Sequence, residues 1–152
     1  GRLVGTDGKN KMSKSLNNAV HISDTAKQVQ KKINKIFTGR QSATEPGDPN
    51  NVLMQYCDIF IPDTDRVAEL RDLYSRGADI GDGHIKQELG AAINEMLEPM
   101  RERRAKYEGD DAYVIDVLKS GTSRANALTE ETLAMAKEAC GLGFFQRSLD
   151  LR

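Results

Sequence analysis

Residues 83–107 read GHIKQELGAAINEMLEPMRERRAKY, the longest stretch of the chain with the apolar spacing of an α-helix. Residues three and four positions apart share one face of a helix, so this spacing predicts a long helix with one buried face. The predicted buried side chains are Ile85, Leu89, Ala92, Ile93, Met96, Leu97 and Met100. A chain of 152 residues with so long an amphipathic helix is expected to build its core by packing helices together.

Shorter helices are predicted on both sides of this stretch. We expect Ser23 and Asp24 to cap the first of them, and Gly39 lies just past its end. No alternation of apolar and polar residues typical of strands follows residue 22. The sequence therefore predicts an all-α helical bundle, preceded by a short irregular segment. The shorter helices are predicted over about 23–38, 52–60, 64–76, 111–119 and 121–140.

The composition is that of a globular protein without a strong overall charge. Apolar residues make up 38% of the chain and charged residues 30%, and the net charge is −1. A polyanionic partner would therefore have to bind a local basic face. The start of the chain lacks the pattern of a secretory signal, and no apolar run is long enough to cross a membrane. Cys57 and Cys140 lack metal-ligand spacing, so we expect free thiols in a reducing cytoplasm and no metal site.

Residues 5–18 read GTDGKNKMSKSLNN and hold the chemistry-bearing groups of the irregular segment. Lys11 and Lys14 place two ammonium groups three positions apart, and Ser13 and Ser15 add hydroxyl donors. Such a loop suits a triphosphate that loses charge during a reaction, because long lysine side chains can follow a leaving group. The spacing of a Walker A loop is absent. On charge pattern alone, a solvated lysine-rich loop is the alternative.

The pentapeptide at residues 11–15 resembles the KMSKS signature of class I aminoacyl-tRNA synthetases. The chain beyond it is similar to the second half of tryptophanyl-tRNA synthetases of the bacterial type. The landmarks that carry this likeness are Lys32, Ile33, Ile36, Thr38, Pro46, Gly47, Pro49, Asn51, Leu53, Tyr56, Gly83, Lys86, Leu89, Leu97, Pro99, Arg103, Leu118, Gly121, Ala125, Thr132, Leu133 and Gly141.

The resemblance implies ATP-dependent activation of tryptophan to its adenylate, followed by transfer to tRNA(Trp). It assigns Lys11 and Lys14 as catalytic residues that bind the β- and γ-phosphates and stabilise the departing pyrophosphate. Met12, Ser13 and Ser15 would complete this part of the ATP site, with Met12 packed against the nucleotide. Mg²⁺ would accompany the nucleotide, and the full-length enzyme would be a cytoplasmic homodimer.

The resemblance also implies two domains. Residues 1–22 would end a Rossmann-type catalytic domain, and residues 23–152 would form the helical domain that approaches the tRNA anticodon. Two basic groups are candidate contacts to the RNA backbone, although solvated charged faces are the alternative for both. These groups are Lys27, Lys31 and Lys35 in the first predicted helix, and Arg101, Arg103 and Arg104 after the buried stripe.

One signature of the family is missing. The H-x-G-H motif does not occur, because the chain has only His21 and His84 and neither stands in such a motif. We therefore expect the amino-acid pocket and most of the ATP site to lie upstream of Gly1, and the chain alone to be inactive. Two alternatives stay open. One is a tyrosyl-tRNA synthetase, whose bacterial forms usually carry a C-terminal module with strands, and the other is a non-catalytic helical RNA-binding module.

Overall fold

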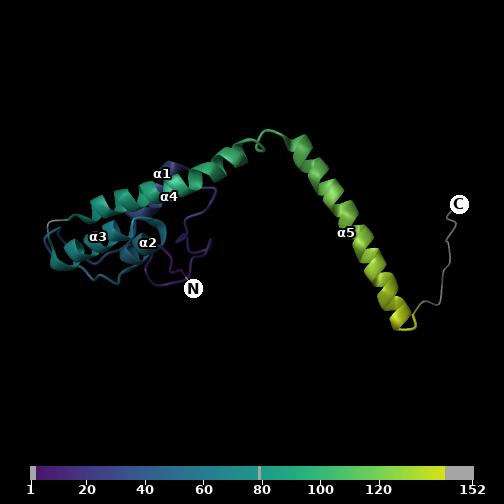
Figure 1. Ribbon diagram of the computed structural model, residues 1–152, viewed down its shortest axis with the longest axis horizontal. Coiled ribbons are helices and arrows are strands. Elements are labelled where there is room, and N and C mark those ends of the chain that lie inside the picture. Colours follow the sequence, from purple (N-terminus) through teal and green to yellow (C-terminus); the bar gives the residue numbers. More distant parts are fainter. Residues whose placement is uncertain (1–2, 79, 143–152) are drawn as a thin grey trace. The chain divides into compact units, whose positions relative to one another are not determined.

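The computed structural model describes residues 3–78 and 80–142, and five helices lie in these ranges (Figure 1). The chain divides into two compact units, Gly1–Arg103 and Arg104–Arg152. Within the described residues, the only extended pairing is an isolated antiparallel bridge between Val4 and Lys11. The prediction of an all-α fold preceded by an irregular segment is confirmed. The helices are α1 (Ala26–Asn34), α2 (Val52–Phe60), α3 (Thr64–Arg76), α4 (Asp82–Ala105) and α5 (Asp111–Ala139).

The predicted bounds of α2 and α3 are confirmed, but α1 begins later and ends earlier than the predicted span of about 23–38. Thr25 is its N-cap, and the Thr25 and Gln28 side chains each bond the other's backbone N–H in a capping box. Asp24 does not cap the helix, because its carboxylate accepts hydrogen bonds from the His21 N–H and from Lys32. The prediction of Ser23 and Asp24 as caps was therefore wrong.

The core of the first unit is built on the buried face of α4. Ile85, Leu89, Ile93 and Leu97 are buried, as predicted, whereas Met96 is 46% exposed. These side chains form one cluster with the apolar faces of the other three helices in this unit. The partners are Val29 and Ile33 of α1, Leu53, Met54, Tyr56 and Cys57 of α2, and Val67, Leu70 and Tyr74 of α3.

The helices α1 and α4 approach each other closely at Gly90. A Cβ atom at this position would lie 2.0 Å from Oε1 of Gln30, so a larger residue would displace the Gln30 side chain from this place. Gln30 in turn donates from Nε2 to the Lys86 carbonyl over 3.0 Å. Lys86 donates from Nζ to the carbonyls of Asn34 (3.2 Å) and Ile36 (2.6 Å). The carbonyl end of α1 is therefore capped by a side chain of α4.

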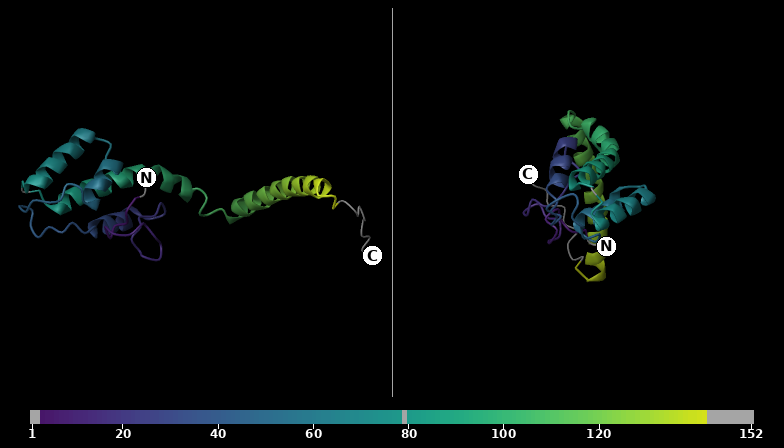
Figure 2. Two further views of the ribbon diagram at one scale, coloured as in Figure 1. Left: turned by 90° about the horizontal axis from the view of Figure 1, so that it is seen from below. Right: turned by 90° about the vertical axis from the view of Figure 1, so that its left-hand side faces the viewer.

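The helix α5 is one continuous helix of 29 residues, not the two helices predicted (Figure 2). Gly121 lies inside it and does not break it, because one glycine costs a helix only about 1 kcal/mol relative to alanine. None of its described side chains is buried. Among the helices that the structure describes, α5 included, none has the length and hydropathy to span a membrane.

Leu89 tests the core of the first unit. Its side chain is fully buried, so Leu89→Ala should lower the free energy of unfolding by about 2–5 kcal/mol, because apolar burial is reduced and a cavity remains. Leu16 is 54% exposed and is the matched control. Leu16→Ala should change the free energy of unfolding by less than about 0.5 kcal/mol. Urea unfolding monitored by circular dichroism measures both. Equal effects of the two variants would contradict the assigned core.

Candidate functional site

The segment at residues 5–18 folds into a closed loop that is held by its own backbone. Gly5 donates its N–H to the Asn10 carbonyl over 2.7 Å, and Thr6 donates to the Asn18 carbonyl over 2.9 Å. A turn follows at the end of the KMSKS pentapeptide, where the Asn17 N–H donates to the Lys14 carbonyl over 3.2 Å. The two ends of the loop therefore meet, although its sequence is rich in glycine and asparagine.

Asn18 fills the centre of this loop. Its side chain is 2% exposed and accepts a 2.7 Å bond at Oδ1 from the Ser13 N–H. Its Nδ2 donates to Oδ2 of Asp7 (3.0 Å) and to the Lys11 carbonyl (3.2 Å). A Cβ atom on Gly5 would lie 2.3 Å from this Nδ2, so glycine is needed beside the amide. One side chain thus fixes the backbone between Lys11 and Lys14 and ties it to Asp7.

Asp7 provides the negative charge at the base of the loop. Its carboxylate accepts a hydrogen bond from the Asn10 side chain, and others from the N–H groups of Lys9 and Asn10 and from Asn18. These bonds, that of the Asn10 side chain foremost, outweigh the effect of burial and hold the pKa of Asp7 well below its usual range. The carboxylate is therefore ionised at neutral pH and its acceptors are used within the loop.

The loop is attached to the helical body through Tyr56 of α2. The buried hydroxyl donates to the Val4 carbonyl at the entry to the loop. Burial, together with the nearby charge of Asp7, raises the pKa of Tyr56 to about 12. The hydroxyl therefore stays protonated at neutral pH and keeps its role as donor.

The structure separates the predicted ATP-binding residues into an exposed group and a half-buried group. Lys11, Lys14 and Ser15 are exposed, and neither lysine has an ion-pair partner among residues 3–78 and 80–142. Ser13 is half-buried, and its Oγ lies 2.8 Å from Oγ of Ser15. Met12 packs against the helical core. The loop therefore exposes the ammonium groups of Lys11 and Lys14 without ion-pair partners, while hydrogen bonds hold the backbone beneath them.

Two of the three lysines predicted on the first helix line one common hollow. Lys27, Lys31 and Lys35 are all exposed, but only Lys31 and Lys35 line a polar hollow of about 220 Å³ beside the KMSKS loop. The other residues of this hollow were not predicted as site residues from the sequence. They are Thr6, Asn17, Gln28 and Lys32.

The predicted arginine cluster does not form a single site. Arg101 donates to the Asp24 carbonyl (3.0 Å), to Oδ1 of Asn94 (2.7 Å) and to Glu98 (2.9 Å), so its guanidinium is used within the protein. Arg104 pairs with Glu108, and both are exposed. Arg103 is exposed and has no ion pair within the described part of the chain. Only Arg103 therefore offers a free charge.

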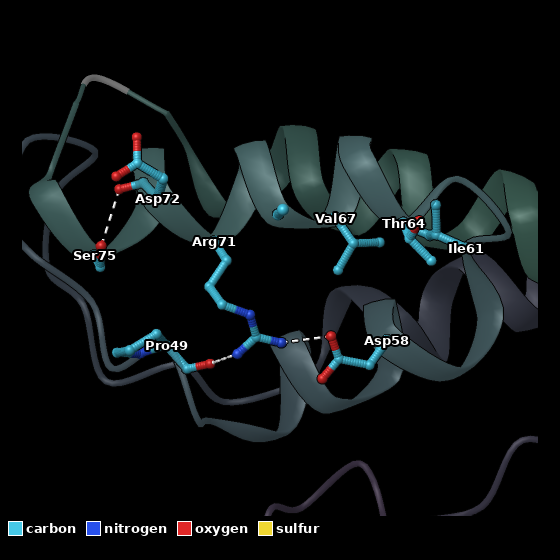
Figure 3. Close-up of a pocket in the computed structure, with 9 residues that line it drawn as sticks. Pro49, Asp58, Ile61, Thr64, Val67, Arg71, Asp72 and Ser75 are labelled. Atoms are coloured by element: carbon cyan, nitrogen blue, oxygen red, sulfur yellow. Dashed lines mark hydrogen bonds and ion pairs between the residues drawn. The ribbon is translucent and has the colours of Figure 1, made fainter.

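Another hollow lies between α2 and α3, and none of the predicted site residues lines it (Figure 3). It has a volume of about 480 Å³ and a partly apolar lining that includes Ile61 and Val67. Arg71 crosses it and donates to the Pro49 carbonyl and to Asp58. These bonds tie the start of α2 to α3, and we regard the hollow as part of the packing. In the described ranges, no three metal-ligating side chains form a cluster.

Comparison with known proteins gives one consistent result. The model of a family described as tRNA synthetases class I (W and Y) matches residues 2–98. The tryptophan–tRNA ligase of Treponema pallidum is 43% identical over 143 residues, which are 92% of this chain and 42% of that protein. The ligase of Clostridium longisporum is 36% identical over 148 residues, or 95% of this chain and 43% of that protein.

Solved structures agree with the sequence comparison. The crystal structure of tryptophanyl-tRNA synthetase from Campylobacter jejuni, complexed with ADP and tryptophan, matches with a TM-score of 0.78 at 29% identity. The match covers 93% of this chain and 44% of that one. A tryptophanyl-tRNA synthetase from Giardia lamblia matches with a TM-score of 0.61 at 31% identity, over 68% of this chain and 27% of that one. The chain therefore spans less than half the length of these relatives.

Asn18 tests the organisation of the loop. Asn18→Ala should cost roughly 1–3 kcal/mol of local stability, because it leaves the Ser13 N–H without its acceptor and removes one of the donors to the Asp7 carboxylate. Asn17→Gly is the matched control, since Asn17 is exposed and its φ of 49° suits glycine. Hydrogen exchange of the Ser13 amide should accelerate in the first variant and stay nearly unchanged in the second. Unchanged exchange in both variants would refute the central role of Asn18.

Proposed function

The chain belongs to the class I tRNA synthetases for tryptophan and tyrosine, and we propose that it is the carboxyl-terminal part of a tryptophan–tRNA ligase. The observation that carries the proposal is the KMSKS loop, whose base is fully hydrogen-bonded while Lys11 and Lys14 remain free. The resemblance to tryptophanyl-tRNA synthetases is confirmed by relatives of that specificity over 92–95% of the chain. They do not favour a tyrosyl enzyme or a non-catalytic module.

The proposed role of the loop is to stabilise pyrophosphate as it leaves. In tryptophan activation, the amino-acid carboxylate attacks the α-phosphate of ATP, and the bond to the β-phosphate breaks. Lys11 and Lys14 would neutralise the charge that gathers on the β- and γ-phosphates, which is typically worth a few kcal/mol for each donor. Ser13 and Ser15 would donate hydrogen bonds, and Met12 would pack against the nucleotide. Mg²⁺ is proposed only as the counterion of the nucleotide, and no carboxylate here is assigned to it.

We assign a different role to each of the two regions that the sequence predicts. Residues 1–22 would complete the catalytic domain, and residues 23–152 would form the helical domain that approaches the tRNA(Trp) anticodon. The boundary between the two compact units, after Arg103, lies elsewhere, because it separates α5 from the core rather than the loop from the helices. Exposed Arg103 and the lysines of α1 are the proposed contacts to the RNA backbone. We place the enzyme in the cytoplasm as a homodimer, and we expect the chain alone to be inactive.

Pyrophosphate exchange by the full-length protein tests the proposed reaction. With ATP and labelled pyrophosphate, exchange should depend on tryptophan, because only the cognate amino acid forms the adenylate at an appreciable rate. Tyrosine in place of tryptophan should give little exchange. Exchange with tyrosine instead would assign the tyrosyl specificity, and exchange with neither amino acid would rule out the enzyme.

Lys14 tests the role of the loop in the full-length protein. Lys14→Ala should slow adenylate formation by about 10²–10³-fold, since it removes a charge that acts on the leaving group. The dissociation constant for tryptophan should change little, because Lys14 is assigned to the phosphates. Lys9, an exposed lysine of the same loop outside the pentapeptide, is the matched control, and Lys9→Ala should leave the rate nearly unchanged. Equal losses in adenylate formation and tryptophan binding would contradict the role of Lys14.

A further inference from the structure

A basic hollow lies between the KMSKS loop and α1. Its lining combines Thr6 and Asn17 of the loop segment with Gln28, Lys31, Lys32 and Lys35 of the helix and its C-cap. The lining contains three lysines, one hydroxyl and two side-chain amides, and no carboxylate. Its volume of about 220 Å³ is sufficient for a phosphate group with its water.

Two of the three lysines in this hollow form no ion pair with the described residues. Lys32 is paired with Asp24 over 2.6 Å and is therefore neutralised. Lys31 and Lys35 have no ion-pair partner in the part of the chain that the structure describes. The carbonyl end of α1 does not need them either, because Lys86 caps it. Two like charges four residues apart on a helix repel each other, so an anion between them would relieve a local cost.

From this arrangement we propose that the hollow binds a phosphate group of the RNA backbone. The chemistry favours phosphate over a base, because the hollow offers cations and hydrogen-bond donors but no aromatic side chain on which a base could stack. The inference rests on the proposed function for its RNA ligand. It goes beyond that function by assigning one contact point, shared by helix and loop.

The site couples RNA binding to the KMSKS loop. The Thr6 N–H donates to the Asn18 carbonyl, and Asn17 is the neighbour of Asn18 in the chain. A phosphate bound in the hollow therefore lies beside two residues adjacent to Asn18: Thr6, which bonds the Asn18 carbonyl, and Asn17, its neighbour in the chain. RNA bound there restricts the loop that carries Lys11 and Lys14.

Titration of the 152-residue chain with a short oligouridylate tests the site. In ¹⁵N-labelled protein, the amide signals of Thr6, Asn17 and Lys35 should shift together. The double variant Lys31→Gln with Lys35→Gln should weaken binding about tenfold, and the salt slope of log Kd should fall by about 0.7 for each lysine–phosphate pair that the substitutions remove. Both lysines are exposed, so circular dichroism should show an unchanged fold.

A matched control removes the same net charge elsewhere. Lys119→Gln with Lys137→Gln changes two exposed lysines of α5 and should alter the Kd by less than twofold. An equal loss in both double variants would reduce the site to general charge attraction and overturn it. Inorganic phosphate is the second arm, and it should shift the same amides but bind more weakly than RNA. If phosphate shifts them and the oligouridylate does not, the RNA assignment is wrong.

Failure of the RNA site and failure of the proposed ligase function give different results. Tryptophan-dependent exchange in the full-length protein without RNA-induced shifts at Thr6 and Asn17 would refute the hollow and leave the ligase intact. Shifts without exchange would refute the ligase and retain the hollow as an RNA contact.

Discussion

The junction between the irregular segment, α1 and α4 depends on one buried residue, Asp24. It is 8% exposed and accepts at Oδ2 from the His21 N–H over 2.7 Å and from Lys32 over 2.6 Å. Its backbone carbonyl accepts from Arg101 of α4 over 3.0 Å. Burial alone would raise the pKa of Asp24, but the hydrogen bonds from Lys32 and His21 outweigh it and lower the pKa. A carboxylate that is charged at neutral pH thus joins the end of the irregular segment to α1, and the backbone carbonyl of the same residue joins α4.

Further bonds within the loop and to α2 give this glycine-rich segment a defined backbone. The polar groups at the base of the loop form hydrogen bonds with one another, through Asp7 and Asn18, and with α2 through Tyr56. The ammonium groups of Lys11 and Lys14 take no part in these bonds and stay in water. Positioning and charge are therefore supplied by different side chains, which suits a task in which a bound phosphate chain must later be released.

The parts of the structure that depend on local rules were predictable from the sequence, and those that depend on distant partners were not. The apolar spacing of α2, α3 and α4 predicted each helix, and the KMSKS pentapeptide predicted the loop. The start of α1 was missed because Asp24 is engaged by Lys32 and cannot cap. Arg101 looked free in sequence, yet its acceptor at Asp24 lies 77 positions away. The central place of Asn18 was equally hidden, since an amide shows its partners only in three dimensions.

The lack of buried side chains on α5 has a thermodynamic consequence. The heat-capacity change of unfolding comes mainly from apolar surface that becomes exposed to water. The described side chains of α5 already contact water, so its melting adds backbone enthalpy and little heat capacity. The heat-capacity change of unfolding then comes mainly from the unit Gly1–Arg103. A heat-capacity change calculated for all 152 residues would be larger than the one that calorimetry measures.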